Sequence, residues 1–229
     1  GWLRPLFATP AEWGIFRLLL AYIRRDRGSK AKHYPMFGMP IAILAVALFQ
    51  GMKDPWAGEA AGFWPFFAAM HPALTLAWIP LLLRFSDQWE AGWIFAVAPG
   101  ATLSDMARGL HRASLLLLIA PAFAATWLVF ALAWRSPVHA VLHVLPPFLG
   151  AVALMDVSLI WRRPVALSCR YIKGEGGTRM ALTFTLMFLF TGLGVVQAIC
   201  AGSLPLTGLL IAVLLTLVFA LDWIMTSVL

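Results

Sequence analysis

The sequence contains little charge and almost no cysteine. Charged side chains make up 12% of its 229 residues and hydrophobic ones 62%, whereas about 25% of a soluble domain is charged. This composition, with a mean hydropathy of +0.85, excludes an ordinary soluble domain and predicts an integral membrane protein. The two cysteines, Cys169 and Cys200, fall on opposite sides of the bilayer in the topology predicted below, so we expect no disulfide between them.

Motifs for catalysis and nucleotide binding are also missing. The glycine-rich residues 173–178 lack the G-x-x-x-x-G-K-[ST] spacing of a phosphate loop. Ser104, Ser136 and Ser158 have no G-x-S-x-G context that would make one of them a hydrolase nucleophile. We therefore expect no cofactor or metal in this chain, and any ATPase activity would reside in a partner.

Positive charge is abundant but unevenly placed. The net charge is +7, and fourteen of the seventeen Lys and Arg residues fall within residues 17–32, 84–112 and 162–179. These stretches flank long apolar runs and leave no lipid-free basic face for a nucleic acid. Because basic loops of membrane proteins face the cytoplasm, we predict that all three stretches and both termini are cytoplasmic, in a bacterial inner membrane.

Six apolar segments are long enough to cross the hydrocarbon core, which takes roughly 20 helical residues. The second and fourth contain prolines, and we expect kinks there rather than breaks, because neighbouring helices or water can satisfy the freed carbonyls. The predicted fold is an all-α, polytopic membrane protein with about six transmembrane helices and two interfacial helices. The predicted spans are residues 34–52, 60–83, 113–134, 137–160, 180–200 and 204–228.

The two interfacial helices are predicted from capping signals. Residues 9–12 read Thr-Pro-Ala-Glu, a capping box with proline at the first helical position, and they open an apolar helix that ends near Arg25. Residues 102–105 read Thr-Leu-Ser-Asp and begin a second helix after a Pro-Gly turn. The predicted organisation is an interfacial and basic cytoplasmic segment at 1–33, then a transmembrane bundle at 34–229 with a cytoplasmic elbow at 84–112.

Three histidines fall within predicted spans. His139 and His143 are four residues apart and therefore share a helix face. Together with His71 they could ligate a metal or a haem, but such sites usually need ligands that converge from several helices. We favour hydrogen bonding between helices as their role.

Two carboxylates also fall in apolar surroundings. Asp156 and Asp222 lie within about two turns of the predicted inner ends of their helices. Pairing with Arg162 or Arg163, or extension of the carboxylate to water, would satisfy them there. The alternative is a role in moving a proton or a substrate, which is the usual reason for an ionisable residue inside a membrane.

Two stretches share a pattern with a known family. The first reads Arg-Arg-Asp-Arg at 24–27 and, after Lys30, Tyr-Pro-Met-Phe-Gly at 34–38. The second is the aromatic and acidic run at 85–95, followed by Ala-Pro at 98–99 and Arg-Gly at 108–109. Together they resemble the permeases of ABC-2 type exporters. The resemblance implies the carboxy-terminal half of the membrane component of an ATP-driven exporter, partnered by a separate ATPase and dimeric.

From this resemblance we expect a permease that couples to its ATPase through the elbow. Simple anchoring of the same side chains at the membrane interface is the alternative. A second functional class is a non-catalytic accessory subunit of a larger membrane complex, and a third is a redox subunit that uses the three histidines. The residues expected to couple are Asp87, Trp89, Glu90, Trp93 and Arg108.

Overall fold

The computed structural model describes residues 3–25, 27–57, 62–76, 102–162 and 176–228. This part of the chain is helical and contains no strand, which confirms the predicted all-α class. The elements are η1 (Arg4–Leu6), α1 (Pro10–Arg25), α2 (Arg27–Phe49), α3 (Phe63–Leu76), α6 (Leu103–Ser114), the π-helical segment η3 (Leu115–Ile119), α7 (Ala120–Trp134), α8 (Pro137–Arg162), α9 (Gly176–Cys200) and α10 (Leu204–Val228).

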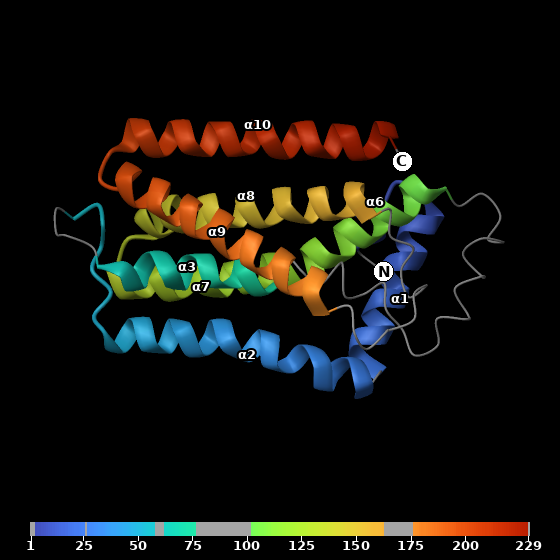
Figure 1. Cartoon of the computed structure of the whole chain (residues 1–229), viewed down its shortest axis with the longest axis horizontal. Coiled ribbons are helices and arrows are strands. Elements are labelled where there is room, and N and C mark those ends of the chain that lie inside the picture. Colours follow the sequence, from blue (N-terminus) through green and yellow to red (C-terminus); the bar gives the residue numbers. More distant parts are fainter. Residues whose placement is uncertain (1–2, 26, 58–61, 77–101, 163–175, 229) are drawn as a thin grey trace.

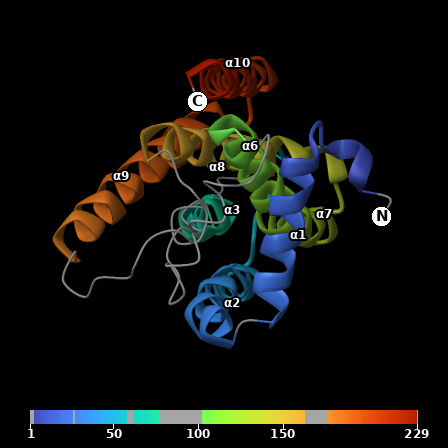
Figure 2. The same cartoon turned by 90° about the vertical axis from the view of Figure 1, so that its right-hand side faces the viewer.

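The helices form an elongated bundle with two different ends. Figure 1 shows α2, α3, α7, α8 and α10 running along the long axis, with α9 crossing them obliquely. The helix α1 lies across one end, where both chain termini are also found, and Figure 2 looks onto this end. The short connections 50–57, 135–136 and 201–203 lie at the opposite end. We call the two ends the terminal end and the hairpin end.

Three described helices are long and apolar enough to cross a membrane: Leu103–Trp134, Pro137–Ile160 and Leu204–Ser227. Two shorter apolar helices, Gly38–Phe49 and Phe188–Cys200, belong to α2 and α9. The chain is therefore suited to lie in a membrane, as its composition predicted. Six spans remain a prediction, because residues 77–83 of the second predicted span lie outside the described part of the chain.

Three of the described helices begin earlier than the spans predicted from apolarity, and one of them, α9, starts at Gly176 rather than at residue 180. The helix α2 starts at Arg27 rather than at residue 34, and the third span is part of a continuous helix that starts at Leu103 rather than at residue 113. Arg and Lys are good helix formers, so a helix can extend past its apolar part into water. The continuous helix has 32 residues, or about 48 Å, against about 30 Å of hydrocarbon. We therefore place its polar first turns outside the hydrocarbon.

Prolines shape the helices without ending them. The helix α8 continues through Pro146 and Pro147, and α3 continues through Pro72, as predicted. The π-helical segment η3 directly precedes α7, and Pro121 is the second residue of α7. A proline ring collides with the carbonyl four residues before it in a regular α-helix, and the wider π turn gives that carbonyl room.

Candidate coupling site

Two helix caps meet at the terminal end of the bundle. The Thr102 hydroxyl accepts a 3.0 Å hydrogen bond from Asp105 N, and Asp105 Oδ2 accepts a 3.2 Å bond from Thr102 N. This confirms the capping box predicted for α6. At the start of α1, Glu12 N donates to Thr9 Oγ1 at 3.2 Å, while the Glu12 carboxylate accepts from Ala8 N at 2.9 Å. The reciprocal bond thus reaches one residue further back than in the usual capping box.

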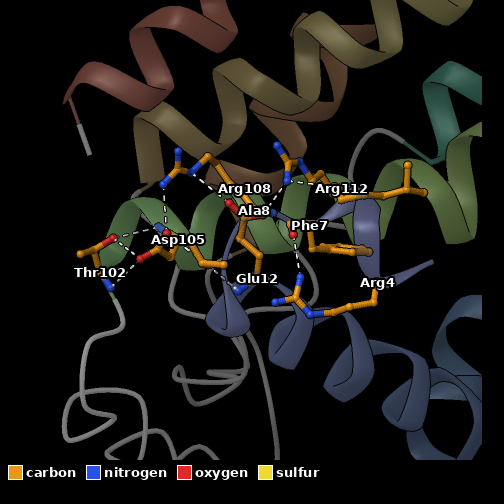
Figure 3. Close-up of polar contacts among 10 residues, drawn as sticks. Arg4, Phe7, Ala8, Glu12, Thr102, Asp105, Arg108 and Arg112 are labelled. Carbon is orange, nitrogen blue, oxygen red and sulfur yellow. Dashed lines mark hydrogen bonds and ion pairs between the residues drawn. The ribbon is translucent and has the colours of Figure 1, made fainter. Parts of the chain in front are cut away.

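The Glu12 carboxylate is the centre of an ion-pair network between α1 and α6. Its side chain is fully buried, and its two oxygens lie 3.3 Å from Arg108 Nε and 2.5 Å from Arg112 Nη1 (Figure 3). Arg112 also donates to the Leu6 carbonyl oxygen at 3.0 Å. A buried carboxylate is stable only when cations and hydrogen-bond donors surround it. The two arginines of α6 therefore allow α1 to bury the Glu12 carboxylate of its first turn.

A second carboxylate extends the network. Asp105 Oδ1 lies 3.0 Å from Arg108 Nη2 and accepts a 3.3 Å hydrogen bond from Thr9 Oγ1 of α1. Burial acts to raise the pKa of Asp105, but hydrogen bonds from Thr102 and Arg108 and the charge of Arg108 lower it below its ordinary value. Asp105 is therefore ionised at neutral pH. Arg108 bridges two carboxylates from two helices (Figure 3).

Gly109 brings the backbones of the two helices into contact. A Cβ atom at this position would lie 2.9 Å from Ile15 Cβ and 3.0 Å from Glu12 Cα. Both distances are shorter than packed carbon atoms allow. A larger residue would therefore require α1 to shift, so glycine at this position allows the backbones of α1 and α6 to lie against each other.

The structure brings together some of the predicted coupling residues and adds others. Arg108 lies in the network, whereas Asp87, Trp89, Glu90 and Trp93 lie outside the described residues. From the sequence, Glu12 was predicted only as part of a helix cap, and no role was predicted for Arg112 or Gly109. Two features of the sequence could have indicated these roles. One is a glutamate at the start of an apolar helix, and the other is an arginine one helical turn after Arg108.

The hairpin end contains a buried histidine that joins three helices. His143 is fully buried, and its Nε2 lies 3.0 Å from the Pro65 carbonyl oxygen of α3. Because a carbonyl can only accept, Nε2 carries the proton, and Nδ1 accepts from Gln197 Nε2 of α9 at 3.2 Å. Both ring nitrogens are therefore engaged between helices. Aromatic rings surround the imidazole at centroid distances of 4.9–5.8 Å: Trp56, Phe66, Phe130 and Trp134.

The other two histidines do not join this site. His139 Nδ1 lies 2.6 Å from Asp54 Oδ2 in the connection after α2. His71 is buried in α3 with its ring against Phe67. Within the described ranges, no group of three or more His, Cys, Asp or Glu side chains could hold a metal ion.

The structure gives Asp156 a partner that the sequence did not suggest. Its side chain is fully buried, and Oδ1 lies 2.9 Å from His111 Nε2 of α6. The predicted extension to water is wrong for this residue, because its side chain is fully buried. The side chains of Arg162 and Arg163, the other predicted partners, lie outside the described part of the chain. Asp222, in contrast, is exposed on α10, where a carboxylate near the helix end can reach water.

The network of α1 and α6 is a set of ion pairs that joins the two helices. It holds two carboxylates and two guanidinium groups in mutual neutralisation and presents no free nucleophile beside a base. Its helix α6 continues through η3 into α7. The chain matches no protein-family model, no curated protein and no solved structure, so the resemblance to ABC-2 type permeases rests on the sequence pattern alone.

Proposed function

We propose that this chain is the permease component of an ATP-driven, ABC-type exporter, and that a separate ATPase acts on its terminal end. One observation carries the proposal. The helix that begins in the α1–α6 network continues without interruption to the hairpin end of the bundle. A displacement of α6 therefore moves α7 along its whole length.

The ion pairs make α1 part of the same moving unit. Glu12 forms ion pairs with Arg108 and Arg112, and Gly109 lets the backbone of α6 lie against that of α1. A partner that pushes on the exposed side of α1 would displace α6 and hence α7. Rigid-body movement of one helix group against another is a common way to open a pathway alternately to each side.

The distribution of charge supports a cytoplasmic position for the terminal end. The exposed basic residues Arg17, Arg24 and Arg25 of α1 lie there, together with Arg108 and Arg112. The described basic residues at the hairpin end are Lys53 and Arg135. The positive-inside rule favours a topology with both termini in the cytoplasm, and this is the side on which an ATPase could bind in a bacterial inner membrane.

Site-specific crosslinking tests the proposal. A photoreactive amino acid replaces the exposed Arg17 in the full chain, and the matched control carries it at the exposed Ala57 of the hairpin end. We expect an adduct with an ATPase of defined stoichiometry from Arg17 only, in native membranes. ATPase adducts from Ala57 alone, or a purified complex that lacks an ATPase, would refute the proposal.

The exposed apolar surface of α10 favours a second candidate function, an accessory subunit of a larger membrane complex. Only 11% of the apolar stretch of this helix is buried. Its exposed surface is therefore available for contact with other subunits as well as with lipid. An accessory subunit would co-purify with other membrane proteins and without an ATPase. A redox role is not supported, because both ring nitrogens of His143 are already engaged.

A further inference from the structure

A buried pair of titratable groups joins α6 to α8 near the terminal end. His111 Nε2 lies 2.9 Å from Asp156 Oδ1, and the side chains are 13% and 0% exposed. Asp156 is about 9 Å along α8 from the end of the helix at Arg162. The pair is distinct from the Glu12 network, although neighbouring residues of α6 contribute to both.

The surrounding charges leave His111 as the partner of Asp156. From α10, Asp222 acts on Asp156 as a like charge. The charged groups of α6 next to His111 are Arg108 and Arg112, and both are directed to Glu12 of α1. Other titratable groups are described on α8 and on the helices that pack against it. They are Asp105 of α6, which bonds to Arg108, His71 of α3, Cys200 of α9, and His139 and His143 of α8 itself.

A pair in this position is most stable when it holds one proton. The proton can reside on the imidazole, which gives an ion pair, or on the carboxyl, which gives a neutral pair. Both forms have no net charge. Loss of the proton to water leaves a buried carboxylate that faces the charge of Asp222, and gain of a second proton leaves a buried imidazolium. Uncompensated charge in such a place is strongly unfavourable.

We propose that His111 and Asp156 form a proton-binding site, and that the bound proton holds α6 against α8. When the proton leaves, the two helices separate so that water can reach the carboxylate. Rising pH therefore opens the terminal end between α6 and α8. This proposal concerns the chain alone and does not require an ATPase.

Spin-label distances between α6 and α8 test the site. Labels are attached to Leu103→Cys and Val157→Cys, both exposed positions, in the full chain in nanodiscs with Cys169 and Cys200 replaced by serine. Between about pH 5 and about pH 8, the ratio of separated to closed forms should rise by up to about tenfold per pH unit, the slope for release of one proton. Asp156→Asn removes the carboxylate that shares the proton, and an imidazolium without that partner would be an uncompensated buried charge, so this variant should show no slope.

The chain offers a matched control at the other end of α8. Asp54→Asn removes the His139–Asp54 pair and should leave the pH response of the α6–α8 labels unchanged. A pH-independent ratio in the parent chain, or an undiminished slope in Asp156→Asn, overturns the proposal. If Asp156→Asn does not fold, His111→Gln decides: an unchanged midpoint of the pH response would overturn the proposal, whereas a shifted midpoint supports it.

Discussion

At the scale of single residues, one carbonyl oxygen explains why a glutamine is buried between α8 and α9. Pro147 has no N–H group, so the carbonyl of His143, four residues before it, has no donor within its own helix. Gln197 Nε2 of α9 donates to this oxygen at 2.6 Å. Inside a bilayer no water replaces a missing backbone donor, so the proline in one helix requires a donor in another.

A double-mutant cycle tests this dependence. Gln197→Leu should lower the free energy of unfolding by about 1–2 kcal/mol, because the His143 carbonyl loses its donor. In a Pro147→Ala background, the restored backbone N–H of residue 147 can donate to the His143 carbonyl. Gln197→Leu should then lower the free energy of unfolding by at most about half as much. The measurement is reversible unfolding in mixed micelles. Strictly additive effects would show that Gln197 does not substitute for the missing N–H.

Glu12 is the residue on which the α1–α6 network depends. Glu12→Gln keeps the shape of the side chain but removes the charge shared by Arg108 and Arg112. Because the arginines are 31% and 36% exposed, they can turn to water, and we expect a loss of about 1–2 kcal/mol rather than the 3–5 typical of a fully buried pair.

Hydrogen exchange of the α1 amides measures this loss, as a decrease in protection of about five- to thirtyfold. The control is Arg17→Gln, an exposed position on the same helix, which should leave protection unchanged. Equal effects of the two variants would mean that α1 is not held by its buried carboxylate.

At the scale of helices, two glycines of the same helix pair should respond in opposite ways to one substitution. Gly109→Ala places a Cβ against the backbone of Glu12 and should destabilise the contact by about 1–3 kcal/mol. Gly14→Ala on α1 meets no atom within 4 Å and should stabilise the helix by about 0.5–1 kcal/mol. Thermal unfolding of both variants shows whether each substitution lowers or raises the stability. Destabilisation by both, or by neither, would contradict the close crossing of α1 and α6.

Signals that are local in sequence predicted the helices well. The connections at 135–136 and 201–203 lie where the apolar runs are interrupted, and the cap of α6 lies at its predicted residues. The helix α2 begins before the span predicted at residues 34–52, because apolarity marks what lies in lipid and not where a helix begins. Residues 84–101 of the predicted elbow lie outside the described part of the chain.

The candidate site was only partly predictable because it depends on distant residues. Arg108 was identified through the resemblance, but its partner Glu12 is 96 residues away in the chain. No periodicity or cap signal indicates which helix faces will meet. The same holds for His111 and Asp156, where depth in the membrane suggested contact with water and packing against α6 prevents it.

At the scale of the whole molecule, the two ends of the bundle differ in chemistry. The terminal end contains the exposed arginines of α1, and the two arginines of α6 with the carboxylates that they neutralise. The hairpin end contains the aromatic rings around His143. Such asymmetry is expected when one end faces an acidic or protein partner and the other closes the bundle between helices.

Coupling to an ATPase requires the terminal end of the bundle to face the cytoplasm. The most direct measurement is labelling of single cysteines by a membrane-impermeant maleimide, at Arg17→Cys of α1 and at Ala57→Cys of the hairpin end, each without the native cysteines. We predict that Ala57→Cys reacts in intact cells and that Arg17→Cys reacts only after the membrane is opened. Labelling of Arg17→Cys in intact cells, with Ala57→Cys protected, would reverse the topology and contradict coupling to a cytoplasmic ATPase.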